Sequence, residues 1–109
     1  MTTRRAAALA AVVLVGASAA CGRAARSHTI EIRGFAYDPA RLEVAPGDTV
    51  VWINRDAVPH TATREGGGWD SRSLASQSEW RLVVTRDDGG PYFCTFHPTM
   101  RGTLVVRAR

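Results

Sequence analysis

Hydrophobic and polar residues alternate along most of the chain beyond residue 28, a pattern typical of half-buried β-strands. In the first such segment, Ile30 and Ile32 are two positions apart and therefore fall on one face. Turn residues, among them Pro46, Gly47 and Asp48, separate the segments. The pattern predicts seven short strands, at residues 28–34, 41–45, 49–54, 61–65, 78–85, 91–96 and 103–108. Short strands with regular turn signals indicate an all-β sandwich or barrel.

No long helical periodicity interrupts this pattern, and residues 71–77 allow at most one helical turn. A chain of 109 residues favours a single domain. We expect aromatic residues to form its core together with the alternating aliphatic side chains. The predicted core aromatics are Phe35, Tyr37, Trp52, Trp80 and Phe93.

The beginning of the chain has the pattern of an export signal. Arg4 and Arg5 precede an apolar run at 6–15, which is too short to span a bilayer comfortably, and small residues follow. Cleavage after Ala19 would release the chain. Cleavage before Cys21, at a sequence similar to a bacterial lipobox, would leave a lipid there.

These features predict the organisation of the chain and its location. We expect a signal peptide at 1–20, a tether at 21–27 and one domain at 28–109. The domain would be exported to the periplasm or the cell surface, and a lipid on Cys21 would be its only contact with a membrane.

Charge does not favour a nucleic-acid-binding surface. All 14 basic residues are arginine, they face 10 acidic residues, and the two signs are interspersed along the chain. Cysteines of exported proteins usually pair, but a lipidated Cys21 would not be available for pairing. Cys94 would then be an unpaired thiol, which indicates a reactive or metal-binding residue.

Scarce residue types are concentrated in one short loop. Cys94, His97 and Met100 are evenly spaced there, and His60 follows the predicted strand at 49–54. One thiolate, two imidazoles and a weak thioether match the donor set of a blue-copper electron-transfer site. Soft sulfur suits copper(I) and imidazole suits copper(II), so such a site needs little rearrangement when an electron moves.

Two other kinds of site use part of this pattern. A cysteine and a histidine at this spacing can begin a zinc site, but a thioether is a poor zinc ligand. The loop also has no second cysteine and no acidic residue. A catalytic cysteine would need a base and an orienting group beside an open nucleophile. The full set of four donors favours copper over both, and we expect a protein that is not an enzyme.

Three stretches, FAYDPARLEVAPGDTVVW, VVWINRDAVPH and YFCTFHPTMRGTLVV, resemble the first strands and the two ligand loops of the cupredoxins, the type 1 blue copper proteins. The short gap between His97 and Met100 is most similar to the amicyanins, since plastocyanins and pseudoazurins have a longer gap. The resemblance covers residues 29–107 and implies a Greek-key β-sandwich of seven to eight strands. It also implies one copper ion that alternates between Cu(I) and Cu(II), with the ligands His60, Cys94, His97 and Met100.

Two positions near the sulfur depart from the amicyanin pattern. Thr61 stands where the family commonly has asparagine, so we expect the tie between the ligand loops to be shorter or absent. The Thr61 amide can still donate a hydrogen bond to the Cys94 sulfur. Phe96 replaces a proline and restores an N–H, which predicts a second hydrogen bond to the sulfur and a higher reduction potential. Together with Thr95, these residues are the predicted surroundings of the sulfur.

The resemblance further implies a one-electron carrier that meets redox proteins transiently and works as a monomer. Pro59, Phe96 and Pro98 flank the histidines, and we expect them to form an apolar docking patch around an exposed edge of His97. The sequence leaves one alternative open. A copper-binding protein for storage, delivery or resistance would hold the same ion without any electron-transfer partner.

Overall fold

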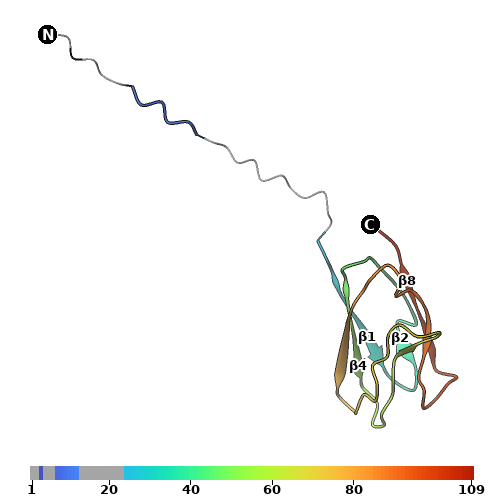
Figure 1. Ribbon diagram of the computed structural model, residues 1–109. Coiled ribbons are helices and arrows are strands. Elements are labelled where there is room, and N and C mark those ends of the chain that lie inside the picture. The colour runs from blue at the N-terminus through green and yellow to red at the C-terminus, as the bar shows by residue number, and fades with distance from the viewer. Residues whose placement is uncertain (1–2, 4–6, 13–23) are drawn as a thin grey trace.

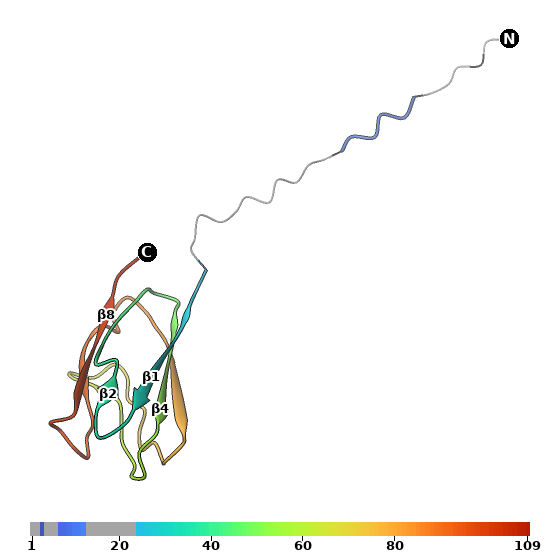
Figure 2. The same cartoon turned by 180° about the vertical axis from the view of Figure 1, so that it is seen from behind.

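The protein folds into two four-stranded sheets that pack face to face (Figures 1 and 2). A computed structural model describes residues 3, 7–12 and 24–109. Its strands are β1 (Ser27–Ile32), β2 (Tyr37–Asp38), β3 (Arg41–Val44), β4 (Thr49–Asn54), β5 (Thr63–Arg64), β6 (Glu79–Val83), β7 (Gly90–Phe93) and β8 (Arg101–Val106). The sheet orders are β2-β1-β4-β6 and β3-β8-β7-β5. β1 and β4 are parallel, as are β3 and β8, and the other neighbours are antiparallel.

The predicted all-β sandwich is confirmed, with differences at three places. β2 was not predicted, because two residues are too short to show an alternating pattern. β7 ends at Phe93, so Cys94 begins a loop and does not lie within a strand. The segment 71–77 has no helical turn, and its Leu74 instead forms an isolated bridge with His60. No helix in the described part of the chain is long and apolar enough to cross a bilayer.

Aromatic side chains fill the space between the sheets. Trp52 is fully buried in β4, and its ring lies 5.2 Å from Trp69, 5.4 Å from Trp80 and 5.6 Å from Tyr92, measured between centroids. Tilted and edge-on contacts of this kind add to the free energy gained from burying apolar surface. The expectation that Phe35 belongs to this core is wrong, since 51% of its surface is exposed.

One buried carboxylate joins the N-terminal and C-terminal segments of the domain. Asp48, in the turn before β4, accepts two hydrogen bonds of 2.6 Å from the guanidinium group of Arg109. It also accepts bonds from the amides of Arg26 and Ala45, and its side chain contacts the ring of His28 at 2.8 Å. The Arg109 guanidinium lowers the pKa of Asp48 far below its usual range, which outweighs the opposite effect of burial.

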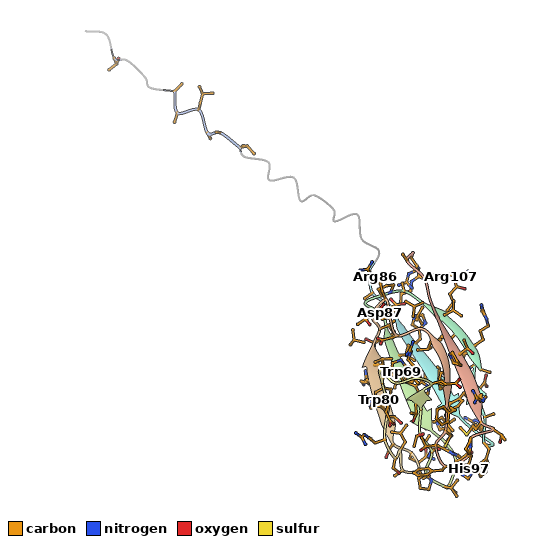
Figure 3. The ribbon with its side chains drawn as sticks, turned by 45° about the vertical axis from the view of Figure 1, so that its right-hand side comes forward. Trp69, Trp80, Arg86, Asp87, His97 and Arg107 are labelled. Carbon is orange, nitrogen blue, oxygen red and sulfur yellow. The ribbon has the colours of Figure 1, made fainter. Side chains whose placement is uncertain are left out.

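The sandwich has two chemically different ends. The C terminus and the beginning of β1 lie at one end (Figure 1). Arg86, Asp87 and Arg107 are found at that same end, and His97 is found at the other (Figure 3). The loops that contain the predicted metal ligands are therefore remote from the point where the N-terminal segment joins the domain.

Candidate metal centre

The first ligand loop runs from the end of β4 to His60. Asn54 is fully buried, and its side-chain amide donates to the carbonyls of Val58 at 2.8 Å and Leu74 at 2.9 Å. His60 then exchanges two main-chain hydrogen bonds with Leu74, of 3.1 and 2.8 Å. A buried amide that spans the loop, followed by this bridge, fixes the backbone on both sides of the turn. The imidazole of His60 is therefore held in place although it lies outside any strand.

The second ligand loop connects β7 to β8 and folds back on itself. The amide of Cys94 donates to the carbonyl of Met100 at 3.1 Å, and the amide of Met100 donates to the carbonyl of His97 at 2.9 Å. β8 follows at once, and a Cβ atom at its Gly102 would overlap the ring of Tyr92 in β7. This close approach requires glycine, and it brings the two strands together beneath the loop.

The two loops bring the predicted ligands to one end of the sandwich. Nδ1 of His60 lies 3.8 Å from the sulfur of Cys94, and both residues are fully buried. The ring of His97, which is partly exposed, lies 5.4 Å from the ring of His60 between centroids. Met100 is 4% exposed and is tied to Cys94 through the main chain. Two imidazoles, one thiol and one thioether therefore belong to a single neighbourhood.

These donors fit copper by their chemistry more than by a finished coordination geometry. Within the described residues, no three or more His, Cys, Asp or Glu side chains stand close enough together to hold a metal ion as they are. The ring of His97 is partly exposed and lies between 4.9 and 5.4 Å from the rings of Phe35 and His60, measured between centroids. The buried thiol beside an imidazole nitrogen, with a thioether in the same loop, suits a soft ion such as copper better than zinc.

Thr61 connects the two ligand loops at the sulfur. Its main-chain amide donates a hydrogen bond to the Cys94 sulfur at 3.3 Å, and its hydroxyl oxygen accepts a hydrogen bond from the amide of Thr95 at 2.9 Å. The tie between the loops is thus present, made by the shorter threonine side chain. The hydroxyl of Tyr37 donates to the Thr61 carbonyl, and burial, together with the nearby Cys94, raises the pKa of Tyr37 above its usual range. Among the described residues no hydrogen bond joins the Phe96 amide to the sulfur, so this second donor stays a prediction.

Asp56 is a member of the site that the sequence did not identify. Its carboxylate accepts hydrogen bonds from Nε2 of His60 at 2.8 Å and from the amides of Gly34 and Phe35 at 2.7 and 2.8 Å. Burial raises the pKa of Asp56, but these three hydrogen bonds outweigh it and leave the pKa below its ordinary value. The spacing of four residues between Asp56 and His60 is the one sequence signal that could have revealed the pair.

The aromatic ring of Phe35 lies against both histidines. Its centroid is 5.0 Å from that of His60 and 4.9 Å from that of His97, and both contacts are edge-on. Phe35 comes from the loop between β1 and β2, where its φ of 59° is uncommon for a residue other than glycine. A third segment of the chain therefore contributes to this end of the sandwich.

Exposed apolar residues flank both histidines in the two ligand loops. Pro59, Phe96 and Pro98 are all exposed, and 51% of Phe96 is accessible. Phe35, which is equally exposed, adds an aromatic ring to this surface. The three residues of the predicted docking patch are thus exposed within the ligand loops themselves.

Comparison with known proteins points to one family. The model of the cupredoxin-like domain matches residues 5–106. Amicyanin from Paracoccus denitrificans is 35% identical over 82 residues, which cover 71% of this chain and 63% of that protein. Amicyanin from Paracoccus versutus is 30% identical over 82 residues, covering 71% and 62%. This chain therefore spans slightly less than two thirds of the length of either relative.

Solved structures agree with this match. The structure of a methionine-to-alanine mutant of amicyanin in the Cu(I) form is similar with a TM-score of 0.67 and 31% identity, and the similarity covers 74% of this chain and 82% of that one. The family match extends over nearly the whole sequence, and the two packed sheets agree with it. The chain belongs to the cupredoxin-like domain family.

Proposed function

We propose that this chain binds one copper ion and carries single electrons between redox proteins outside the cytoplasm. His60, Cys94, His97 and Met100 would hold the ion, which would supply one-electron chemistry by alternating between Cu(I) and Cu(II). The observation that supports this most strongly is the buried pair of His60 and Cys94, whose Nδ1 and sulfur lie 3.8 Å apart. Asp56 already occupies Nε2 of the same ring, so Nδ1 is the nitrogen left for a metal.

The protein residues would keep the ligands in one arrangement during electron transfer. The Thr61 amide donates to the Cys94 sulfur and would stabilise the negative charge of a thiolate. Main-chain hydrogen bonds close the loop between Cys94 and Met100, so its two sulfur-bearing residues keep their separation. The partly exposed His97 would offer the shortest route for an electron between the buried site and a partner at the surface.

A carrier fits the environment of the cysteine better than an enzyme does. Cys94 has no accessible surface, and a nucleophile must be open to its substrate. The exposed apolar residues Pro59, Phe96 and Pro98 suit a small and transient contact with another redox protein. We propose that a monomer makes this contact.

A lipid anchor at the start of the predicted tether would orient the domain relative to the membrane. Cys21, and with it the choice between lipidation and cleavage after Ala19, lies outside the described residues. β1 begins at Ser27, one residue before the predicted start of the domain. Its beginning and His97 are at opposite ends of the sandwich (Figures 1 and 3). A lipid on Cys21 would therefore leave the ligand end free, and mass spectrometry of the exported protein would show whether a lipid is attached.

Addition of copper(II) to the exported protein tests the proposal. We expect an intense visible band from thiolate-to-copper charge transfer, with one ion bound per chain. Cys94→Ser should abolish the band, whereas His28→Gln, at the opposite end of the sandwich, should keep it. A colourless protein would refute the proposed copper site.

A second measurement separates electron transfer from copper handling. Electron self-exchange between the reduced and oxidised forms, measured by NMR line broadening, should be fast for a carrier. Tight binding of one copper ion with very slow self-exchange would instead support storage or delivery.

A further inference from the structure

We propose that Asp56 is a positioning residue of the copper site, and that its single carboxylate fixes both the His60 ring and the Gly34–Phe35 turn. Through that turn it also sets the position of Phe35 against the two imidazoles. The inference rests on the proposed function, because it assumes that His60 and His97 are copper ligands.

The hydrogen bonds of Asp56 define its role on the side of His60. Oδ2 lies 2.8 Å from Nε2 of His60, and the Asp56 side chain is only 13% exposed. The main-chain amide of Asp56 donates in turn to the side-chain oxygen of buried Asn54 at 3.0 Å. A carboxylate that accepts the Nε2–H leaves Nδ1 of His60 without a proton, and Nδ1 is the atom that faces the Cys94 sulfur. Asp56 would thus select both the tautomer and the orientation of the ring.

The same carboxylate also binds the turn before β2, whose flanking residues Arg33 and Ala36 exchange two main-chain hydrogen bonds. Gly34 and Phe35 both have positive φ angles, of 61° and 59°. In this arrangement their successive amides point at Asp56, with distances of 2.7 Å to Oδ1 and 2.8 Å to Oδ2. Successive amides that converge in this way form a nest for an anion. The bonds to the anion offset the unfavourable backbone conformation of Phe35, which glycine would adopt more readily.

The position of Phe35 follows from that turn. Its ring makes edge-on contacts with His60 and His97, with centroid distances of 5.0 and 4.9 Å. Asp56 therefore reaches one histidine directly by a hydrogen bond and the other indirectly through an aromatic ring. Two ligands from separate loops would depend on one carboxylate that lies on neither of the strands bordering the second loop.

Removal of the charge should weaken the preference for copper(II). A carboxylate behind a metal-bound imidazole makes that imidazole a stronger donor, and its loss typically lowers metal affinity about 10–100-fold. We therefore expect Asp56→Asn to lower copper(II) affinity about 10-fold or more and to raise the reduction potential. Asp56→Glu, which keeps the charge, should lie closer to the unmodified protein in both quantities.

The matched control is Asp88→Asn. Asp88 also caps a turn, through a 2.7 Å hydrogen bond from the Thr85 amide, and it follows Asp87 at the opposite end of the sandwich (Figure 3). If Asp56→Asn and Asp88→Asn change copper affinity and reduction potential equally, Asp56 has no positioning role. A colourless unmodified protein is a different result, because it refutes the copper site itself.

A readout without copper tests the geometry directly. In the copper-free protein, the Nε2 proton of His60 should give a hydrogen-bonded NMR signal that is lost in Asp56→Ala, which removes the acceptor, and kept in Phe35→Leu. The variant that carries both substitutions should shift the reduction potential by less than the sum of the two single shifts, because both substitutions act on the same rings. A persistent hydrogen-bonded Nε2 proton signal in Asp56→Ala, or strictly additive changes, would overturn the proposal.

Discussion

The main-chain N–H of Thr61 donates to the sulfur of Cys94 at 3.3 Å, although the two residues are 33 positions apart in the sequence. The Thr61 hydroxyl makes a second link, since it accepts the amide of Thr95, the residue next to Cys94. One threonine therefore joins the loop of His60 to the loop of Cys94 by its backbone and by its side chain. The arrangement of the predicted ligands depends on this join.

Thr61→Val separates the two links. The hydroxyl is lost while the amide that reaches the sulfur is retained, so we expect the copper-free protein to lose about 1 kcal/mol of unfolding free energy. Urea denaturation measures this loss, and the blue colour of the copper form should remain. Thr103→Val is the control, because no hydrogen bond in the described residues involves its side chain. Equal stability of the two variants would contradict the role given to the hydroxyl.

Exchange of Met100 tests the weak fourth donor. Glutamine offers a harder oxygen, which favours copper(II), so Met100→Gln should lower the reduction potential measured by voltammetry. Met100→Leu removes the donor without adding oxygen and should raise it. A higher potential in the glutamine variant would show that Met100 does not influence the ion in the way proposed.

Phe96→Pro tests the second hydrogen bond predicted at the sulfur. The sequence predicts that the Phe96 amide donates to the copper-bound thiolate, in addition to the Thr61 amide found at 3.3 Å. Removal of that N–H by proline should then lower the reduction potential, because the thiolate loses a stabilising donor. An unchanged or higher potential would leave Thr61 as the only amide that acts on the sulfur.

A charge introduced on the apolar surface tests its role in docking. Phe96→Asp should leave the visible spectrum unchanged and should slow electron self-exchange, because two copies that approach through this surface would then repel each other. Val83→Asp, at a residue that is 64% exposed on β6, is the matched control and should have little effect. Equal rates in the two variants would place the electron-exchange contact elsewhere.

The buried carboxylate at the other end predicts a dependence of stability on pH. The bonds from Arg109 lower the pKa of Asp48 in the folded protein below the value of about 4 expected for the unfolded chain. The resulting stabilisation is fully present above about pH 4 and is lost as the pH falls below it. Denaturation of the copper-free protein should show this loss, and Asp48→Asn should remove much of it. The exposed Glu79→Gln should behave like the unmodified protein, and an Asp48 variant with the same acid sensitivity as the unmodified protein would contradict the prediction.

Several features of the fold could be predicted from the sequence because their causes are local. Alternation of apolar side chains marked the strand that holds Ile30 and Ile32, and both are fully buried. The even spacing of Cys94, His97 and Met100 indicated the second ligand loop, because a loop of this length keeps its residues close whatever the rest of the chain does. The family resemblance rested on the same short stretches.

Only the tertiary structure decided the roles of Phe35 and Asp56. The aromatic character of Phe35 predicted burial, yet its ring lies at the surface against His60 and His97. The turn that carries Phe35 is closed by the main-chain bonds between Arg33 and Ala36. Hydrogen bonds from Gly34 and Phe35 hold it against Asp56, across 22 and 21 positions of sequence. Periodicity reports which face of one strand is buried, but these hydrogen bonds form only once β1 has paired with β4, which places the loops that follow the two strands side by side. For that reason the sequence alone determined which residues could bind a metal, and the packed sandwich decided what surrounds and orients them.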